Sequence, residues 1–365
     1  MSSPRVLSIQ SHIVSGYCGN KAATFPLQLL GFDVDVMNTV SFSNHTGYPS
    51  WTGEKATGDQ LTKLFEGLET NGLVDYTHLL TGYIGSAQNL TAVASIIERL
   101  QDHGQPFFVL DPVMGDHDQL YVQPDVIPIY KGLLKFAKAI TPNQFEAEIL
   151  ADKKITDIQS CLEVIDILHK EGVEHVILTS VTLSIKDIQN CSRSASSSTT
   201  TNRTNGGVTT NGSKLSEEND SNDKDDKDSS HTALYCVCSS STSSTSKPRA
   251  FAIGFPTYDG YFTGTGDLFS ALLVARLHEA LKDTTSQNTL PALTQACLKV
   301  VATMKAVVLR TYLTQKGTPG RSLDRTQASA SQIVKRCELR LIQSKPEIEH
   351  PDLGGVHAIE IFSLD

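Results

Sequence analysis

A glycine-rich turn with a carboxylate, Gly-Thr-Gly-Asp at residues 264–267, leads into an apolar segment that begins at Leu268. Free backbone N–H groups and the positive end of a helix dipole make such a turn an anion site, and glycine lets the backbone approach the anion closely. A carboxylate there would repel a phosphate unless it had chemical work, such as accepting a proton from a hydroxyl while the amides hold the phosphoryl group. Asp267 is therefore our candidate base, and the turn predicts a kinase for a small alcohol. The alternative is a plain Asp N-cap after a flexible turn.

Two further pairs of carboxylates follow expected strands. Asp111 and Asp116 stand five positions apart across a proline and a glycine, and Mg²⁺ favours a few carboxylates combined with substrate phosphates. Glu146 and Glu148 follow the apolar run 139–140, where an acid in the first helical turn also complements the helix dipole. The pattern is explained either by a magnesium site or by solvated acids in polar turns.

Hydroxyl and aromatic groups follow other expected strands. Ser11 stands in a Gln-Ser-His sequence, and the segment 41–48 mixes aromatic and hydrogen-bonding side chains, as a flat heteroaromatic ligand requires. Tyr83 could add a wall to the same pocket, while Thr179 and Ser180 could bind a phosphate oxygen or a monovalent cation. Each residue alone is more often a turn cap or a packed core residue. Polar groups after five strands, together with an anion turn, favour one shared site.

Short apolar runs alternate with amphipathic segments along the chain. The runs are 6–9, 34–37, 78–80, 107–110, 139–140 and 176–178, and helical spacing occurs at 61–68, 90–100, 126–136 and 161–169. Continuous apolar strands that alternate with helices are typical of a largely parallel sheet covered on both faces. Ligands in such sheets lie beyond the carboxyl ends of the strands. We therefore expect the polar residues named above to meet at that edge.

Composition restricts the function classes. A net charge of −9 argues against a general binder of nucleic acid or anionic membranes, although nucleotide binding needs only local positive potential. No apolar run appears long enough to cross a bilayer, and the N-terminus shows no secretory leader. Seven scattered cysteines fit a reducing cytosol, so we expect a cytoplasmic protein that also reaches the nucleus by diffusion. The pair Cys236 and Cys238 lacks a partner pair for a metal and is better explained by a strand.

One low-complexity segment interrupts what we expect to be a single domain, residues 1–365. Residues 184–230 are nearly all Ser, Thr, Asn, Gly, Asp and Lys. Such a segment buries too little apolar area to offset its ordering entropy, so we predict an insertion that is disordered. A second Ser/Thr-rich stretch, 239–247, follows a possible strand at 231–238. A phosphorylated regulatory loop is the functional alternative to an insertion without a specific site.

The motifs resemble, in order, those of the pyridoxal kinases of the ribokinase-like superfamily. The resembling segments are 10–12, 43–48, 111–113, 141–148, 264–269 and the tail 339–345. The motif at 264–269 marks the wider superfamily, while Ser11 and the segment 45–48 point to pyridoxal. The resemblance covers essentially the whole chain apart from the low-complexity segment. It implies an α/β fold, a three-layer α/β/α sandwich with a mostly parallel central sheet and a small β flap over the active site, usually in a homodimer.

The resemblance also implies a role for each matching residue. Asp267 would be the base acting on the 5′-hydroxymethyl group and would also bind the substrate. The other implied sets are Gly264, Thr265 and Gly266 as an anion hole; Ser11, Thr46 and Tyr83 around the pyridine ring; Asp116 and Glu146 for Mg²⁺ or another divalent cation; Asp111, Thr141 and Thr179 for a monovalent cation, K⁺ or Na⁺; Asp111, Asn143, Gln144, Phe145, Glu146, Thr179, Ser180, Tyr258, Asp259, Gly260 and Thr265 for ATP; and Tyr121 in the flap. The chain departs from the family pattern in the short connection 117–119 before Tyr121 and in the insertion upstream of 258–260.

These implications give one leading hypothesis and two rivals. The leading hypothesis is ATP-dependent phosphorylation of the 5′-hydroxymethyl group of pyridoxal, pyridoxine and pyridoxamine, which salvages vitamin B6. A hydroxymethylpyrimidine kinase, or another ribokinase-like kinase of small alcohols, would share Asp267 but need a different first pocket. A non-catalytic carrier of pyridoxal 5′-phosphate would retain Ser11, Thr46 and Tyr83 without needing the carboxylates.

Overall fold

The computed structural model describes residues 3–197, 232–241, 248–258, 260–283, 290–316 and 329–362 of the 365-residue chain. Within these ranges ten strands form one sheet in the order β12-β11-β10-β9-β8-β5-β4-β1-β2-β3. The strands are β1 (Arg5–Ile13), β2 (Asp33–Phe42), β3 (Gly53–Lys55), β4 (His78–Thr81), β5 (Phe107–Leu110), β8 (Ala139–Ile140), β9 (His175–Ser184), β10 (Thr232–Ser240), β11 (Arg249–Gly254) and β12 (Ala358–Ile361). A separate hairpin consists of β6 (Gly115–Asp116) and β7 (Gln119–Leu120).

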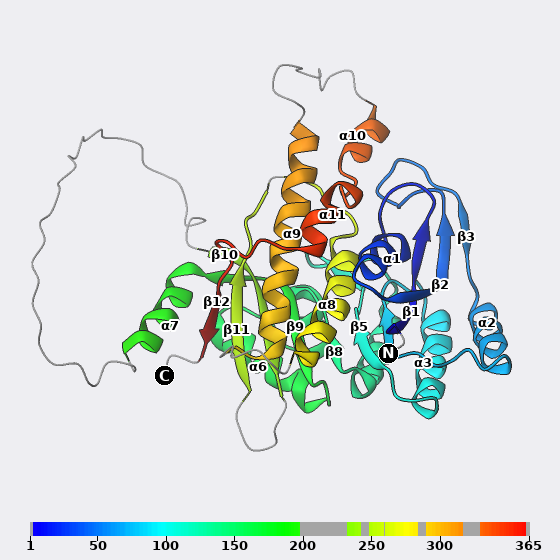
Figure 1. Ribbon diagram of the computed structural model, residues 1–365, viewed down its shortest axis with the longest axis horizontal. Helices are drawn as coiled ribbons and strands as arrows, with labels where there is room; N and C mark the ends of the chain where they lie inside the picture. Colours follow the sequence, from blue (N-terminus) through cyan, green and yellow to red (C-terminus); the bar gives the residue numbers. More distant parts are fainter. Residues whose placement is uncertain are drawn as a thin grey trace, which may run out of the picture.

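The sheet has a parallel centre and antiparallel margins. β2, β1, β4, β5, β8 and β9 pair in parallel, whereas β3 at one edge and β10, β11 and β12 at the other pair antiparallel. The six parallel strands contain the six apolar runs found in the sequence, so the expected α/β fold is confirmed. Figure 1 shows the sheet extending from β12 to β3 across the molecule.

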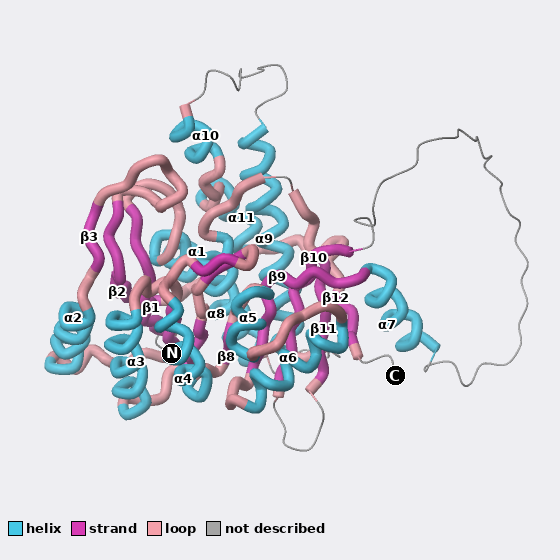
Figure 2. The backbone as a smooth tube through the Cα atoms, turned by 180° about the vertical axis from the view of Figure 1, so that it is seen from behind, coloured by secondary structure: helices cyan, strands magenta, loops and turns pink. Residues whose placement is uncertain are grey.

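Helices cover both faces of the sheet and form the outer two layers. They are α1 (Asn20–Leu29), α2 (Gly58–Thr70), α3 (Ala87–Asp102), α4 (Ile127–Leu133), α5 (Gln144–Ala151), α6 (Ile158–Lys170), α7 (Ile185–Ser197), α8 (Thr265–Lys282), α9 (Ala292–Lys316), α10 (Ala330–Arg336) and α11 (Lys345–Glu349), with 3₁₀ turns at Pro124–Val126, Leu134–Phe136 and Ile342–Ser344. α8 and α9 lie in front of the sheet in Figure 1, and α5 and α6 lie in front of it in Figure 2. This is the three-layer arrangement that the sequence predicts.

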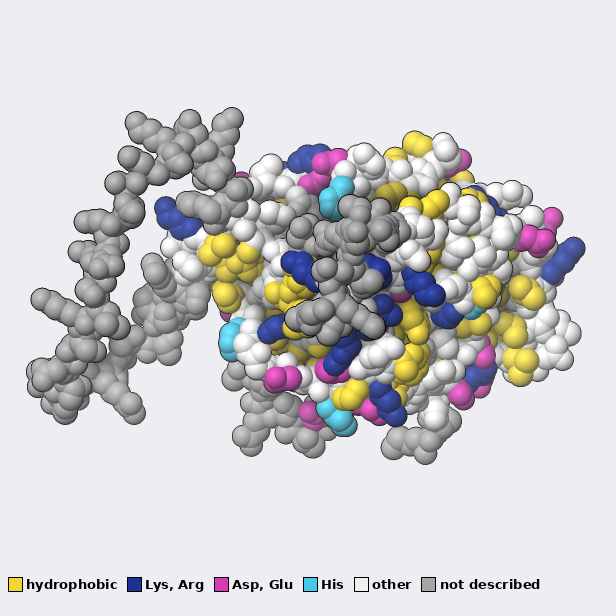
Figure 3. All heavy atoms as spheres, turned by 90° about the horizontal axis from the view of Figure 1, so that it is seen from above, with side chains coloured by type: hydrophobic (Ala, Val, Ile, Leu, Met, Phe, Trp, Pro, Cys, Tyr) yellow, Lys and Arg dark blue, Asp and Glu magenta, His cyan; other side chains and the backbone are white. Residues whose placement is uncertain are grey.

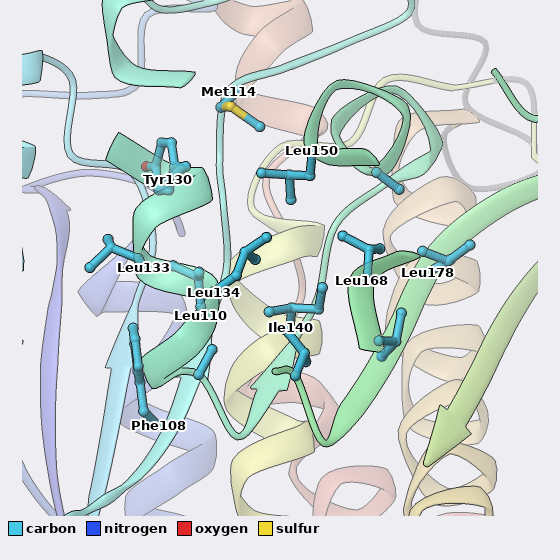
Figure 4. Packing of buried hydrophobic residues seen from close by; sticks show 14 of the residues in the cluster. Phe108, Leu110, Met114, Tyr130, Leu133, Leu134, Ile140, Leu150, Leu168 and Leu178 are labelled. Carbon is cyan, nitrogen blue, oxygen red and sulfur yellow. The ribbon is translucent and has the colours of Figure 1, made fainter. Parts of the chain in front are cut away.

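Alternation along the strands builds two cores, one on each face. In β5, Phe108 and Leu110 are buried against α3, α4 and α6, while Val109 belongs to the cluster under α8 and α9. Ile140 of β8 and Leu178 of β9 continue the first core (Figure 4). Fully burying such a side chain contributes roughly 1.5–3 kcal/mol. These two cores fix the carboxyl ends of the parallel strands, where the candidate residues lie.

Part of the expected low-complexity insertion is ordered, which corrects our prediction for 184–230. α7 occupies Ile185–Ser197, and Ile188 and Cys191 are buried at helical spacing against β9 and β12. The Cys191 thiol lies 3.8 Å from the carbonyl oxygen of Phe362. Apolar residues spaced three apart were enough to dock one helix on a sheet edge. The remainder of the expected insertion, residues 198–230, lies outside the described residues.

The second Ser/Thr-rich stretch, 239–247, is also partly strand. Ser239 is buried at the end of β10 and contacts His169 Nε2 at 3.1 Å, and Ser240 contacts His175 Nδ1 at 2.8 Å. Hydrogen bonds to the half-buried imidazole of His169 and the buried imidazole of His175 therefore hold polar residues that the composition alone assigned to a loop. Residues 242–247 lie outside the described ranges. The strand expected around Cys236 and Cys238 is confirmed as β10, with both thiols buried.

The expectation that no apolar run reaches membrane-spanning length is wrong for α9. This helix is long and apolar enough by length and composition, and it is the one such helix in the described part of the chain. Its apolar residues Val300, Val301 and Val307 are fully buried in the core under α8 and β10. α9 therefore acts as a core helix of the sandwich.

Candidate active site

The glycine-rich turn forms the N-terminus of α8. Gly264 is the N-cap, with φ of 81°, and as a glycine it has no side chain that could cap the first-turn amides. A Cβ at this position would overlap the carbonyl oxygen of Tyr17, so the turn packs directly against another loop. Asp267 consequently stands inside the first helical turn and is not the N-cap that the alternative reading required. The first-turn amides remain available to an anion, as the sequence predicts.

The Asp267 side chain reaches away from its own helix. Its Oδ2 accepts a 2.7 Å hydrogen bond from the backbone N–H of Gly19. Gly19 has φ of 53°, and a Cβ there would overlap the backbone of Ser11. Burial raises the pKa of Asp267, and the Gly19 amide offsets part of that rise. The expected base and the expected substrate residue Ser11 therefore flank the same glycine.

A second carboxylate, Asp111, lies beside the turn. A Cβ on Gly266 would be 3.8 Å from its Oδ2, and this oxygen is buried without a hydrogen-bond partner in the described structure. Burial, and then the charges of Glu146 and Asp267, raise its pKa well above the usual range, while hydrogen bonds to Ser270 and Thr141 oppose the rise. A buried carboxylate oxygen without a partner is costly unless a cation or a proton satisfies it.

Glu146 is held by backbone amides on both carboxylate oxygens. Oε1 accepts from the N–H of Met114 at 2.9 Å, and Oε2 accepts from the N–H of Asn143 at 3.0 Å within a capping box. Burial raises its pKa to about 7 against the opposing effect of these amides, and the charge of Asp116 adds to the rise. Oε1 also accepts from the N–H of Gly115 at 3.4 Å. Glu146 thus braces the turn before the hairpin, and Oε2, with one bond from Asn143, retains a lone pair for one more ligand.

The β6–β7 hairpin lies directly before Tyr121, the residue that we expect in the flap, and the flap's position over the site stays a prediction. His117 and Asp118 have φ of 49° and 58°, the left-handed pair of a tight hairpin turn. Asp116 Oδ1 accepts a 2.8 Å bond from the N–H of His117, and the Asp116 side chain is half-exposed. Tyr121 is 60% exposed just after the hairpin. The short connection noted in the sequence is therefore a complete two-residue turn.

Among the described residues, no group of three or more His, Cys, Asp or Glu side chains could hold a metal ion. Asp116 and Glu146 would therefore need phosphate oxygens or water to complete a magnesium shell, which is how Mg²⁺ is usually held beside nucleotides. The donor set fits the ion, because it supplies hard oxygen ligands and the unsatisfied oxygen of Asp111 lies in the same group of carboxylates.

The hydroxyl residues expected near the monovalent cation and the ATP phosphates lie on two elements, the loop after β8 and strand β9. Thr141 Oγ1 and Ser270 Oγ are 2.9 Å apart, next to Asp111. Thr179 and Ser180 lie inside β9 rather than after it, at a bulge where both stand opposite Cys236. Bulges commonly redirect side chains beside active sites. Thr179 N–H also donates to the carbonyl oxygen of Pro142, which joins β9 to the loop before α5.

Other residues of the expected ATP set make contacts within the protein. Asn143 is the N-cap of α5 and donates from Nδ2 to the carbonyl oxygen of Gly115 at 2.7 Å. The Gln144 side chain bonds to three partners, Glu148, Ile155 and Thr182. Phe145 lies against the hairpin, because a Cβ on Gly115 would be 2.7 Å from its ring. Gln144 therefore has a structural task that its sequence position did not reveal.

The segment expected near the adenine or ribose packs against the end of α9. The Tyr258 ring lies 5.0 Å from the ring of Tyr312, and a Cβ on Gly260 would be 2.7 Å from Gln315 Oε1. Asp259 falls outside the described residues. No contact in the described structure joins Tyr258 or Gly260 to the other residues of the ATP set, so their nucleotide role stays a prediction.

The substrate residues lie on neighbouring elements at the carboxyl edge. Ser11 is part of β1, which continues to Ile13, and it stands opposite a bulge of β2. Tyr83 packs on the small apolar cluster around Ile13 and Phe42, and burial raises its pKa. Thr46 is exposed in a turn in which the N–H of Gly47 donates to the ring of His45 at 3.1 Å. Ser11 and Tyr83 therefore border the loop around Gly19, through Gly19 itself and through Cys18, while Thr46 lies in the turn 45–48.

Comparison with known proteins identifies the family. A family model described as phosphomethylpyrimidine kinase matches residues 55–215. The chain is 36% identical over 355 residues to the pyridoxal kinase of Bos taurus, with 96% of each chain covered, and 37% identical over 349 residues to that of Arabidopsis thaliana, with 95% of this chain and 92% of the relative covered. The chain belongs to the pyridoxal kinase family.

Solved structures agree with this assignment. The pyridoxal kinase of Leishmania donovani in complex with ADP and pyridoxamine superposes with a TM-score of 0.72 at 30% sequence identity, and the match covers 98% of this chain and 99% of that one. The ribokinase-like three-layer fold expected from the sequence is thereby confirmed. The glycine turn, the β6–β7 hairpin and the carboxylate group described above thus belong to a chain with this fold.

Sequence reasoning missed Ser270 and Glu338 of the candidate site, and the contact between Gly19 and Asp267. Ser270 lies one helical turn after Gly266 and donates to its carbonyl oxygen at 3.0 Å, a spacing that could have identified it. Gly19 is the N-cap of α1, and nothing in the sequence indicates that its N–H binds Asp267. Glu338, which bonds to the loops around Tyr17 and Tyr48, carries no sequence signal except its place before the family tail at 339–345.

Proposed function

We propose that this chain transfers the γ-phosphate of ATP to the 5′-hydroxyl group of pyridoxal, pyridoxine or pyridoxamine. The observation that carries the proposal is the position of Asp267, inside the first turn of α8 and bonded to Gly19 beside Ser11. A base in this position lies between an amide-lined anion turn and the strand expected to contact the pyridine ring. Relatives at 36–37% identity over nearly the whole chain are named pyridoxal kinases, which supports this substrate class.

Positioning and charge neutralisation explain most of the expected rate. Phosphoryl transfer needs in-line alignment more than covalent chemistry. The amides of the turn Gly264–Gly266 and the dipole of α8 would hold the transferring phosphoryl group, while Asp267 orients the attacking hydroxyl and accepts its proton. The raised pKa of Asp267 makes its carboxylate a stronger base toward the proton of the attacking hydroxyl group.

Cations belong to the proposal because the site is acidic. Burial and neighbouring carboxylates raise the pKa values of Asp111 and Glu146, so both carboxylates gain by binding a positive ion. Asp116 and Glu146 would hold Mg²⁺, and Asp111, Thr141 and Thr179 would surround K⁺ or Na⁺. When bound, these ions would neutralise the negative charge of the phosphates.

One rival retains a specific observation in its favour. The family model that matches residues 55–215 is described as phosphomethylpyrimidine kinase, which names a substituted pyrimidine in place of a pyridine ring. Full-length similarity to pyridoxal kinases favours pyridoxal. Comparing kcat/KM for pyridoxal with that for hydroxymethylpyrimidine decides between them, because the higher value identifies the acceptor.

The first experiment is a coupled assay of ADP release with pyridoxal, Mg²⁺ and K⁺, in which pyridoxal 5′-phosphate is followed by its absorbance. We expect pyridoxal-dependent ADP release matched by product. ATP binding without product would contradict the proposal and favour another small alcohol or the carrier. The homodimer and the cytoplasmic location expected from the sequence remain predictions, to be checked by light scattering and by imaging of the tagged chain.

A further inference from the structure

The carboxylate of Glu338 joins two loops at the carboxyl edge of the sheet. Its Oε2 accepts a 3.0 Å bond from the backbone N–H of Tyr17, and its Oε1 accepts a 3.0 Å bond from the hydroxyl of Tyr48. The Nε2 atom of His45 lies 3.3 Å from the same Oε1. Glu338 comes from the segment between α10 and α11, about 290–320 positions away from these partners. One side chain of the C-terminal segment therefore contacts both N-terminal loops.

The contact is enclosed and charged. The Glu338 side chain is only 8% exposed, and a Cβ on Gly16, which has φ of 102°, would overlap its carboxylate. Burial alone would raise the pKa of Glu338, but hydrogen bonds from His45, Tyr17 and Tyr48 outweigh it and leave the pKa below its usual value. Burial, and then the charge and hydrogen bond of the same carboxylate, raise the pKa of Tyr48 to about 12, so the phenol stays a donor.

The two loops are those that carry the proposed chemistry. Two residues after Tyr17, the N–H of Gly19 binds the Asp267 carboxylate, and the carbonyl oxygen of Tyr17 lies against Gly264 of the anion turn. On the other side, the His45 ring accepts from the N–H of Gly47 and so shapes the turn that contains Thr46. Glu338 itself contacts neither Asp267 nor the anion turn in any interaction described above.

We propose that Glu338 is a positioning residue, which locks the substrate turn 45–48 against the loop 16–19 and thereby sets the pyridoxal pocket and the orientation of the base. The inference rests on the proposed function for its readout. Removing the carboxylate leaves the N–H of Tyr17, the Tyr48 hydroxyl and His45 without their common acceptor, so both loops gain freedom. Because the proposed function places the vitamer against these loops, we expect pyridoxal binding to weaken more than ATP binding.

The test compares Glu338→Ala and Glu338→Gln with the matched variant Glu347→Gln. Glu347 belongs to the same C-terminal segment, but its carboxylate pairs with Arg310, away from both loops. We expect Glu338→Ala to raise KM for pyridoxal about 10- to 100-fold, as for losing hydrogen bonds to a charged group, and to change KM for ATP less than about threefold. Glu338→Gln keeps one oxygen acceptor and recovers part of the loss. Glu347→Gln leaves both KM values unchanged.

A double-mutant cycle covers the case in which Glu338→Ala fails to fold. Tyr48→Phe removes one hydroxyl only, and we expect a rise of a few fold in KM for pyridoxal that disappears when Tyr48→Phe is added to Glu338→Gln. Equal changes in both KM values, or fully additive effects in the cycle, would overturn the proposal. An active wild-type enzyme with an unaffected Glu338→Ala variant rejects this inference alone. A wild-type chain without pyridoxal-dependent turnover rejects the proposed function instead.

Discussion

The backbone N–H of Gly19 donates a 2.7 Å hydrogen bond to Oδ2 of Asp267, a residue 248 positions further along the chain. This bond joins the loop after β1 to the first turn of α8. It fixes one carboxylate oxygen of Asp267 in the helical turn that follows Gly264. The geometry of the base is therefore set by a backbone amide rather than by another side chain, and it does not depend on that partner's protonation.

The first prediction concerns Asp267→Asn. We expect kcat to fall about 10²- to 10⁴-fold, the usual range for loss of a general base, because asparagine cannot accept the hydroxyl proton. The side-chain oxygen of asparagine can still accept from the N–H of Gly19, so fold and ATP binding should remain. Steady-state formation of pyridoxal 5′-phosphate and calorimetric titration with ATP measure the two effects. A variant with near-normal kcat would contradict the assignment of Asp267 as the base.

The second prediction concerns the loop that holds the base. Gly19→Ala places a Cβ on the backbone of Ser11 at a positive φ, which costs roughly 1–2 kcal/mol before any overlap is relieved. We expect a lower melting temperature and strongly reduced turnover, because the amide that orients Asp267 must move. Gly132→Ala is the control, since α4 leaves open space there and alanine should stabilise the helix. Equal behaviour of the two variants would contradict the proposed tight loop.

The elements that position the site were predictable because their signals are local. The run at residues 107–110 is strand β5 with the same bounds, and the turn at 264–267 opens a helix as expected. Apolar continuity and glycine placement are properties of neighbouring residues, so a sequence displays them directly. The same local reasoning failed for α7, where a few apolar residues within a polar composition were enough for docking on β12.

The partners of the site residues were not predictable, because they come from distant segments. Nothing near Asp267 indicates Gly19, and nothing near Tyr48 indicates Glu338. The strands also run further than their apolar cores, so Ser11 and Thr179 lie within β1 and β9 instead of after them. The register shifts at both positions, through an extra residue in β9 at Thr179 and in β2 opposite Ser11, and such a shift depends on the paired strand as well as on the residue itself.

The surface shows how an acidic chain can bind a nucleotide. The net charge is −9, yet Lys and Arg side chains gather near the middle of the face seen from above in the orientation of Figure 1 (Figure 3). Local positive potential of this kind attracts phosphates irrespective of the overall charge. The expectation that a negative balance does not exclude nucleotide binding is consistent with this distribution.

The third prediction is that protonation of Glu146 makes the stability of the fold depend on pH. Its pKa is raised from 4.5 in the unfolded chain to about 7 in the fold, so between these values the folded state binds more protons than the unfolded state. Stability is then greatest below pH 4.5 with respect to this group and is lost as pH rises to 7. We expect the melting temperature of the ligand-free protein to fall more steeply from pH 5 to pH 8 than that of Glu146→Gln.

Mg²⁺ with a non-hydrolysable ATP analogue provides the complementary measurement. Mg²⁺ binds the deprotonated carboxylate of Glu146. Adding Mg²⁺ and the ATP analogue should therefore increase the melting temperature of the natural sequence more at pH 8 than at pH 6. Glu146→Gln should lose most of that difference. If the pH slopes of the two proteins coincide, the burial of Glu146 does not control its protonation.

The fourth prediction tests the monovalent cation around Asp111. The unpartnered Oδ2 of this buried carboxylate requires either a proton or a cation, and the Thr141 and Ser270 hydroxyls beside it complete an oxygen-rich wall. Asp111→Asn removes the charge but keeps the volume, so we expect activation of turnover by K⁺ or Na⁺ to fall at least about tenfold, as for loss of a hydrogen-bonded charge partner.

Ser270→Ala serves as the control for Asp111→Asn, because it removes one hydroxyl from the same wall without changing its charge. We expect Ser270→Ala to shift the concentration of K⁺ needed for half-maximal rate only a few fold. Titrations with KCl and NaCl at constant ionic strength, with kcat as the readout, separate specific activation from screening. If Asp111→Asn retains the full response to K⁺, the unsatisfied oxygen serves the phosphates of ATP through Mg²⁺ or holds a proton, and the monovalent site must be sought elsewhere.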